Sequence, residues 1–226
     1  SLRRLKTDYI DLYWVHHPDD VTPSEEILRG LEDLVRAGKI LYAGLSNFPA
    51  WRLSRAATLA ELKNTVPIAA AQFQHSLVNR GPEADLIPAS QALGLGMVTW
   101  SPLGGGMLTG KYRQGEKGRE EGFGGKVFQQ ENSIQRTAIL DAVLSIAGEL
   151  NVSADQVAIA WAGTHGTIPI IGPKSLQQAE SNLHAIDVVL SPDQIQLLDS
   201  VSQITTPDQN RIPILSSGIK HQIIIA

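Results

Sequence analysis

Short apolar runs rich in β-branched residues alternate with longer segments of helical periodicity along most of the chain. This alternation is typical of βα units around a parallel sheet, which must be covered on both faces or closed into a barrel. It predicts strands at residues 9–15, 39–45, 68–74, 97–100 and 167–171. The chain therefore belongs to the α/β class.

A helix is predicted after each strand, from periodicity and from capping residues. Thr22 and Pro23 are predicted as the N-cap and the first helical position of the first helix, which ends near Gly38. Ser153 and Ser175, each followed three residues later by glutamine, are predicted caps as well. The other predicted helices are residues 51–63, 84–93, 133–150, 154–165, 176–186 and 192–201. The Gly-rich stretch 104–131 is too long for a plain connection and predicts a functional loop.

The chain opens in the middle of the pattern, because residues 1–6 resemble the end of a basic helix. The five βα units fall short of the eight that close a TIM barrel, so we expect the remaining units to precede this segment. Residues 1–226 are thus interpreted as one domain: the C-terminal five units of a (β/α)8 TIM barrel with one extra C-terminal helix. An open barrel edge at residues 9–15 predicts self-association.

Composition excludes several classes of function. The net charge of −4 argues against nucleic acid and anionic membranes as partners. The absence of cysteine excludes disulfides, thiolate catalysis and thiolate metal sites, and no metal site is predicted. No apolar run long enough to span a membrane and no signal-peptide pattern is present in the sequence, so a soluble cytoplasmic protein is expected.

Polar side chains follow each predicted strand, and parallel strands place their carboxyl ends on one face, where TIM barrels carry their active sites. These candidates are His16, Ser46, Asn47, Gln72, Trp100, Ser101, Gly104, Lys174 and Ser175. Each one also has a structural interpretation. His16 could be a core histidine, Ser46 and Asn47 a helix cap, and Gln72 and Trp100 core residues. The glycines after Leu103 could form a plain turn or approach a phosphate, and Lys174 could simply be solvated.

Taken together, these segments resemble the aldo-keto reductase family, in order and spacing, from residue 1 to about residue 203. Residues 8–16 resemble the family's fourth strand, which ends in its active-site histidine, here His16. Residues 44–48 resemble the fifth-strand motif, and Gln72 falls at the sixth-strand glutamine. Residues 100–103 resemble the seventh-strand motif. Residues 171–175, with Gln178 and Asn182, resemble the eighth-strand segment.

The resemblance implies a NADP(H)-dependent oxidoreductase that reduces a small aldehyde or ketone by hydride transfer. It implies that Ser46, Asn47 and Gln72 hold the nicotinamide carboxamide and that Trp100 stacks on the ring. It assigns the pyrophosphate to Ser101, Pro102, Leu103, Gly104 and the loop that follows. Lys174, Ser175, Gln178 and Asn182 are implied for the 2′-phosphate and adenine. His16 is implied beside the carbonyl oxygen, where it would stabilise growing negative charge.

Some positions depart from the family pattern. None of the four tyrosines has the context of the family's general acid, which comes with its lysine and aspartate partners from the first three units, so we expect little turnover from this chain. Gln178 and Ser181 stand where an arginine and a glutamate are common in the family. Both departures weaken the preference for NADP over NAD that the resemblance implies. Residues 77–80 and 123–126 resemble the bacterial and potassium-channel-β-like branches. The alternative is therefore a non-catalytic NADP-binding module for redox sensing or interaction. The sequence does not identify the carbonyl substrate.

Overall fold

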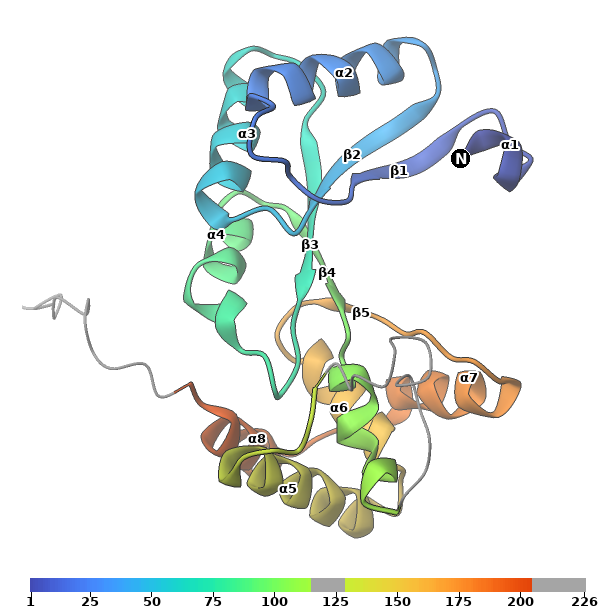
Figure 1. Ribbon diagram of the computed structural model, residues 1–226, viewed down its shortest axis with the longest axis vertical. Helices are drawn as coiled ribbons and strands as arrows, with labels where there is room; N and C mark the ends of the chain where they lie inside the picture. Colours follow the sequence, from blue (N-terminus) through green and yellow to red (C-terminus); the bar gives the residue numbers. More distant parts are fainter. Residues whose placement is uncertain (115–128, 205–226) are drawn as a thin grey trace, which may run out of the picture.

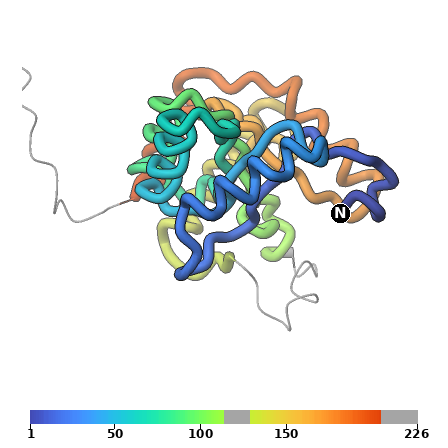
Figure 2. Tube along the Cα trace, turned by 90° about the horizontal axis from the view of Figure 1, so that it is seen from above, coloured from blue at the N-terminus to red at the C-terminus, as the bar shows by residue number. Residues whose placement is uncertain are grey.

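The computed structural model describes residues 1–114 and 129–204, which are the coloured parts of Figure 2. Within them, five parallel strands form one sheet whose neighbour order follows the chain order, β1-β2-β3-β4-β5. The strands are β1 (Ile10–Val15), β2 (Ile40–Ser46), β3 (Ile68–Gln74), β4 (Gly96–Trp100) and β5 (Ile168–Ile170). Because every pairing is parallel, the carboxyl ends of all five strands lie along the same edge. The predicted strands and the partial barrel are confirmed (Figure 1).

Helices follow the strands as βα units require. They are α1 (Leu2–Leu5), α2 (Ser24–Arg36), α3 (Ala50–Leu62), α4 (Leu86–Ala92), α5 (Ile134–Leu150), α6 (Ala154–Gly163), α7 (Leu176–Leu183) and α8 (Pro192–Ser202). Short 3-10 segments are η1 (Gly81–Ala84), η2 (Gly104–Thr109), η3 (Lys111–Gln114) and η5 (His184–Asp187). The predicted caps at Ser153 and Ser175 are confirmed, the first as a complete capping box.

Several predicted boundaries are wrong. Thr22 does not cap α2: Pro23 is the N-cap residue, and the Thr22 hydroxyl donates to the Asp19 carboxylate instead. The helix predicted over residues 84–93 is α4, which is shorter and runs from Leu86 to Ala92, with η1 before it. The helix predicted over 176–186 is split into α7 and η5. The helix predicted over 154–165 ends at Gly163. The first part of the predicted loop 104–131 is 3-10 helical, while residues 115–128, including the motif at 123–126, lie outside the described residues.

Apolar side chains form two separate clusters. The sheet core lies between the strands and α2, α3 and α4, and it includes Leu28, Leu45, Leu53, Phe73 and Met97. The helical core lies among α5, α6, α8 and η2, and it includes Leu108, Val143, Trp161 and Leu198. Figure 1 shows α2 to α4 beside the upper part of the sheet and α5 to α8 around its lower end.

The helical core contains α5 and α6, two strongly apolar helices of the described residues. Across the described ranges, no single helix is long and apolar enough to span a membrane. The pair α5 and α6, which is bent by 102°, passes that test only when the two helices are taken together.

Candidate functional site

Asn47, the first residue after β2, joins the ends of four strands through hydrogen bonds. Its side-chain nitrogen donates to the backbone oxygen of His16 at 2.9 Å, and its side-chain oxygen accepts from the indole nitrogen of Trp100 at 2.9 Å. Its backbone nitrogen donates to the backbone oxygen of Gln72 at 2.8 Å. Its φ of 59° lies in the left-handed region, which asparagine tolerates better than most residues. Three of the predicted site residues therefore meet at Asn47.

Ser46 lies beneath this network and is completely buried. Its hydroxyl donates to the side-chain oxygen of Gln72 at 3.2 Å and accepts from the Asn47 amide at 3.0 Å. The structure excludes the helix-cap interpretation of these two residues, because α3 begins at Ala50 with Pro49 as its N-cap. Gln72 accepts through its oxygen, so its amide nitrogen remains the donor that it can offer to a ligand.

His16 is exposed at the end of β1, so the core-histidine interpretation is wrong. Its ring packs edge-on against the ring of His17, with 4.4 Å between centroids. The Nε2 atom of His17 lies 3.3 Å from the Asn47 amide nitrogen. Among the described strands, β1 pairs only with β2, so Asn47 is a main tether of the segment that carries His16.

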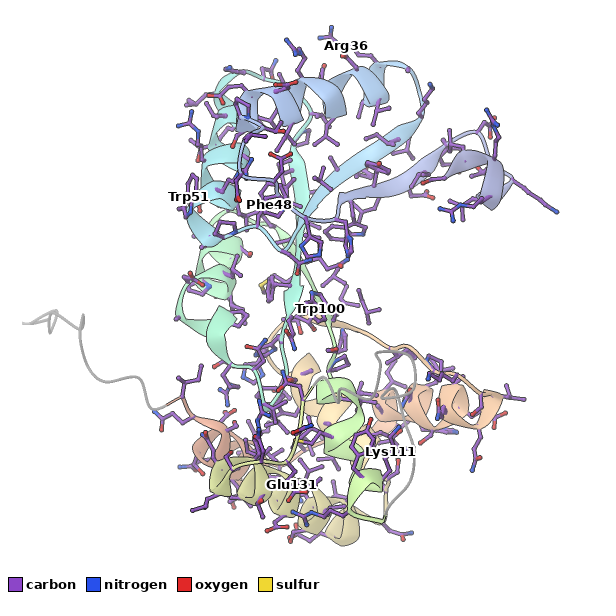
Figure 3. All side chains as sticks on the ribbon, viewed as in Figure 1. Arg36, Phe48, Trp51, Trp100, Lys111 and Glu131 are labelled. Atoms are coloured by element: carbon purple, nitrogen blue, oxygen red, sulfur yellow. The ribbon has the colours of Figure 1, made fainter. Side chains whose placement is uncertain are left out.

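Arg52 anchors the same segment, and the sequence interpretation missed it. It is 9% exposed in α3, and its guanidinium donates to the backbone oxygens of Asp19 and Thr22. Its guanidinium carbon lies 5.3 Å from the centroid of the ring of Phe48, a residue labelled in Figure 3. Hydrogen bonds from Thr22 and then Val21 hold the pKa of the Asp19 carboxyl below its usual value. An arginine on the buried face of a predicted helix was the signal that could have identified it.

Residues 101–103 form the turn that leads out of β4. Ser101 has a φ of 59°, and its backbone oxygen accepts from the Gly104 nitrogen at 2.9 Å. Pro102 is buried, and Leu103 packs against the helical core. This turn therefore connects the strand end beside Asn47 with the second half of the molecule.

A turn of three glycines follows at residues 104–106, and all three have positive φ values. A Cβ atom built on Gly106 would lie 3.1 Å from the Lys111 Cε atom and 3.3 Å from its Nζ atom. The Tyr112 hydroxyl donates to the backbone oxygen of Gly105 at 3.0 Å. An ammonium group beside a glycine turn of this kind suits an anion. The sequence interpretation missed Lys111, which is labelled in Figure 3, although a cation shortly after a glycine turn was visible.

The residues after β5 are arranged differently. Lys174, Ser175 and Gln178 are exposed at the start of α7. The Ser175 hydroxyl accepts from the Gln178 backbone nitrogen at 3.2 Å, and the Gln178 side-chain oxygen accepts from the Lys174 backbone nitrogen at 2.8 Å. Asn182 is buried, and its amide donates to the Asp155 carboxylate of α6 at 2.8 Å. The structure therefore brings Lys174, Ser175 and Gln178 together at the start of α7, whereas Asn182 is bonded to the helical core.

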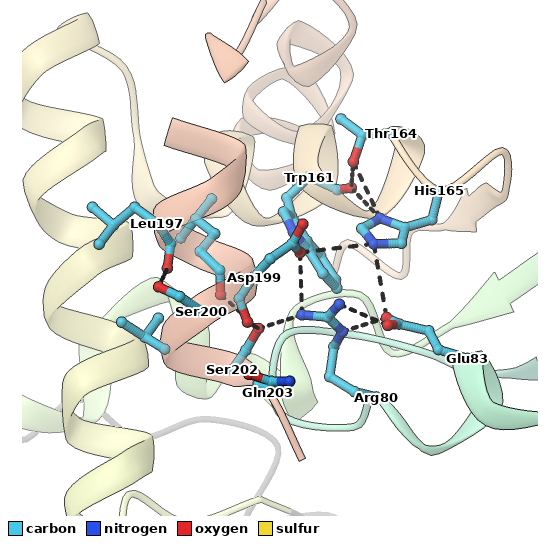
Figure 4. Close-up of polar contacts among 12 residues, drawn as sticks. Arg80, Glu83, Trp161, Thr164, His165, Leu197, Asp199, Ser200, Ser202 and Gln203 are labelled. Carbon is cyan, nitrogen blue, oxygen red and sulfur yellow. Dashed lines mark hydrogen bonds and ion pairs between the residues drawn. The ribbon is translucent and has the colours of Figure 1, made fainter. Parts of the chain in front are cut away.

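A partly buried group of charged and aromatic residues joins the segment after β3 to the helical core, and we call it the ionic network. Its members are His75 and five residues that Figure 4 labels: Arg80, Glu83, Trp161, His165 and Asp199. Arg80 pairs with Glu83 on one side and, at 3.1 Å, with Asp199 on the other, and its guanidinium lies 4.9 Å from the Trp161 ring centroid.

Two histidines complete the ionic network. The Nε2 atom of His75 lies 2.8 Å from the Glu83 carboxylate, while its Nδ1 atom is buried with no partner among the described residues. The Nε2 atom of His165 lies 3.7 Å from Glu83 and 3.8 Å from Asp199. Burial holds the pKa of His165 below its usual value. The network joins the segment after β3 to α6 and α8.

The arrangement can bind a planar amide and, beyond it, a pair of phosphates. No cluster of three or more His, Cys, Asp or Glu side chains suited to a metal ion occurs within residues 1–114 and 129–204. Asn47 bonds to the Trp100 indole and, through the Ser46 hydroxyl, is connected to the Gln72 amide. The glycine turn and Lys111 follow the end of β4 along the chain.

Comparison with known proteins agrees with this arrangement. The model of the aldo/keto reductase family matches residues 1–203. An uncharacterized oxidoreductase of Bacillus subtilis is 35% identical over 204 residues, which are 89% of this chain and 61% of that protein. A probable voltage-gated potassium channel subunit beta of Oryza sativa is 32% identical and is covered to 65%, with 90% of this chain matched. An NADP(+) aryl-alcohol dehydrogenase of Phanerodontia chrysosporium is 30% identical, with 96% of this chain and 57% of that protein covered.

A solved structure shares the fold. The crystal structure of a thermostable aldo-keto reductase with the inhibitor epalrestat superposes with a TM-score of 0.69 at 29% identity. The match covers 88% of this chain and 62% of the other. The chain therefore spans about three fifths of the length of the proteins it matches.

Proposed function

The chain belongs to the aldo/keto reductase family, and from that premise we propose that its protein is an NADP-dependent oxidoreductase that reduces aldehydes or ketones to alcohols. The observation that carries the proposal is the bonded group of Asn47, Trp100, Ser46 and Gln72 beside His16 at the carboxyl ends of four adjacent strands. The relatives named as aryl-alcohol dehydrogenases favour an aromatic aldehyde as the substrate class.

The cofactor would be NADP(H), and the residues present fit it. Gln72 has an amide donor to offer and Asn47 an amide oxygen, as a carboxamide requires. The Lys111 ammonium lies beside the glycine turn, where a positive charge suits a pyrophosphate. The Lys174 ammonium and the Ser175 hydroxyl, exposed at the start of α7, suit the additional 2′-phosphate. When bound, the nicotinamide supplies the hydride for the carbonyl carbon.

The residues of this chain would then orient the reactants. Trp100 offers a flat face to a ring, and the amides of Asn47 and Gln72 would fix the rotation of that ring. His16 would contact the carbonyl oxygen and stabilise its growing negative charge, a contribution of about 3 kcal/mol for one donor. The carbonyl oxygen must also receive a proton from an acid. The Tyr112 hydroxyl is already engaged, because it donates to the backbone oxygen of Gly105. We therefore expect slow turnover from these 226 residues.

Calorimetric titration of the chain with NADPH, and in parallel with NADH, tests the proposal. We expect saturable binding of NADPH, weaker binding of NADH, and weakening of NADPH binding by Trp100→Ala and Lys174→Met. Trp51→Ala is the matched control, because it also removes an indole and the Trp51 side chain is 68% exposed in the first turn of α3. An absence of NADPH binding by the unmodified chain would contradict the proposal for this segment.

The second candidate is a non-catalytic NADP-binding module for redox sensing or interaction, and the potassium channel subunit among the relatives favours it. Mixing the chain with NADPH and benzaldehyde separates the two. If NADPH is oxidised and His16→Ala lowers the rate of that oxidation, the result supports the reductase. Tight binding with no oxidation supports the module.

Self-association is also proposed. In the described sheet, β1 and β5 each have one neighbouring strand, and the side chains of Leu41 and Tyr42 are exposed. Unpaired strand edges beside apolar side chains favour association with a second copy. Light scattering is the measurement, and a clean monomer at micromolar concentration would contradict it.

A further inference from the structure

The indole N–H of Trp100 bonds to Asn47 across the end of β3, although β4 and β2 are not neighbours in the sheet. Adjacent strands lie about 5 Å apart, so these two strand ends are separated by roughly 10 Å. The long indole side chain bridges that distance. A phenylalanine would present a flat face at the same position, but it has no N–H, so the bond depends on tryptophan.

The two partners of the Asn47 side chain determine how its amide is oriented. The indole nitrogen of Trp100 can only donate, and the backbone oxygen of His16 can only accept. The amide oxygen must therefore face Trp100, and the amide nitrogen must face His16. The opposite orientation would bring donor against donor and acceptor against acceptor.

Without the indole N–H, the Asn47 amide would have an alternative. Ser46 Oγ lies 3.0 Å and His17 Nε2 lies 3.3 Å from its nitrogen, and both groups can either donate or accept. A reversed amide would still find partners there, but His16 would lose its donor. The Asn47 backbone is held by Gln72, so rotation of the side chain is the freedom that remains.

We propose that Trp100 is a positioning residue: its N–H sets the orientation of the Asn47 amide, and that amide holds the end of β1 that carries His16. The cofactor-facing ring on β4 and the histidine on the edge strand are thereby coupled through one side chain. The importance of this coupling for carbonyl reduction rests on the proposed function. The coupling itself is a property of the chain without ligand and can be measured there.

The first experiment compares Trp100→Phe with Trp51→Phe by NMR and hydrogen exchange of the full 226-residue chain. We expect the side-chain amide resonances of Asn47 to shift in Trp100→Phe, and amide exchange over residues 16–22 to accelerate about tenfold, which corresponds to the loss of one hydrogen bond. Trp51→Phe removes an exposed indole from α3 and should change neither. Asn47→Asp should accelerate the exchange as well, because a carboxylate accepts from Trp100 but cannot donate to His16.

The second experiment measures NADPH affinity in a double-mutant cycle. Asn47→Ala should weaken binding about tenfold in the unmodified chain and only about twofold in Trp100→Phe, because the amide is then no longer oriented. The inference is overturned if Trp100→Phe leaves both the Asn47 resonances and the exchange of residues 16–22 as they are in Trp51→Phe. If the unmodified chain binds no NADPH but Trp100→Phe still changes the resonances and the exchange, the proposed function fails and the positioning role stands.

Discussion

The site residues after β2, β3 and β4 bond to one another, whereas those after β5 are exposed or bond to the helical core. We call these two groups the sheet-core end and the helical-core end of the site. Asn47, Ser46 and Gln72 form a connected set with Trp100 before any ligand is present. After β5, Lys174 projects into solvent and Asn182 is held by α6. The first end is thus organised for directional recognition, and the second offers charge and an open helix start.

The ionic network links these two regions. Arg80 and Glu83 follow β3, while Trp161 and Asp199 belong to the helical core. The backbone nitrogen of His75 also lies within hydrogen-bond distance of the Trp100 backbone oxygen, at 3.4 Å. The ionic network thus connects the two ends of the site, and substitutions in it should have the largest effects on stability.

Arg80→Leu should have the greatest effect. It leaves the Glu83 and Asp199 carboxylates without their common cation. Because this group is only partly buried, the cost should lie between about 1 kcal/mol, as for an exposed pair, and about 3–5 kcal/mol, as for a fully buried one. Urea unfolding should show this loss, and hydrogen exchange should place it first in α6 and α8. Arg55→Leu removes an exposed pair with Glu25 and should cost at most about 1 kcal/mol. Equal costs for the two variants would show that the network does not join the regions.

Acid should weaken the same connection. Burial raises the pKa of Glu83, but hydrogen bonds from His75 and Arg80 outweigh it and lower the pKa from 4.5 to about 2. The charged carboxylate therefore stabilises the fold above pH 4.5, and this stabilisation, up to about 3 kcal/mol, is lost as the pH falls to about 2. Because burial lowers the pKa of His165, its protonation below pH 6.5 opposes folding as well.

Glu83→Gln should consequently flatten the acid limb of a plot of unfolding free energy against pH. Glu25→Gln is the control, since the Glu25 carboxylate is also paired with an arginine but is exposed. A steep acid limb that persists in Glu83→Gln would assign the acid sensitivity to other groups.

Gly104→Ala tests the turn where the two regions meet. Its φ is 55°, and an added Cβ would lie 2.6 Å from the Val78 Cγ2 atom, so the variant should lose about 1–3 kcal/mol and bind NADPH more weakly. Gly148→Ala is the opposite case, because that glycine lies inside α5 with open space around it and should gain about 0.5–1 kcal/mol. Calorimetric unfolding and titration measure both, and a neutral Gly104→Ala would remove the need for glycine there.

Ser175→Ala should have the smallest effect on stability and the most selective effect on binding. Loss of the cap bond to Gln178 costs about 1 kcal/mol, and NADPH affinity should fall while NADH affinity changes little. Ser133→Ala removes an equivalent cap at α5, by its bond to Arg136, and should leave both affinities unchanged. If the two variants have the same affinities for NADPH and NADH, α7 does not form part of the phosphate site.

The strands and several helix starts were predictable because their signals are local. Alternating apolar runs identified all five strands, and a serine with glutamine three residues later identified the start of α6. The start of α2 was missed because Asp19 competes for the Thr22 side chain through a turn that periodicity does not reveal. The split of α7 from η5 is a change of helix type without a change of composition.

The candidate site was predicted from the types of residues and their places at strand ends, but not the bonds among them. The Trp100 to Asn47 bond joins residues 53 positions apart, and its geometry depends on the sheet. Arg52 and the ionic network were missed because an arginine or glutamate in isolation is usually solvated. Their burial follows from packing between distant elements, which one sequence does not display.

The neighbour order of the strands also bears on how the chain folds. Each strand pairs with the next one along the chain, so the sheet can grow by adding one βα unit at a time, as repeat proteins do. The bond of Arg80 to the Ser202 hydroxyl joins residues 122 positions apart and needs α8 in place. During synthesis, the group of Arg80 and Glu83 therefore cannot complete its contacts until almost the whole described chain has been made. Until that contact forms, the apolar surface around Trp161 and α8 stays uncovered, and such surface makes an incompletely made chain prone to aggregation.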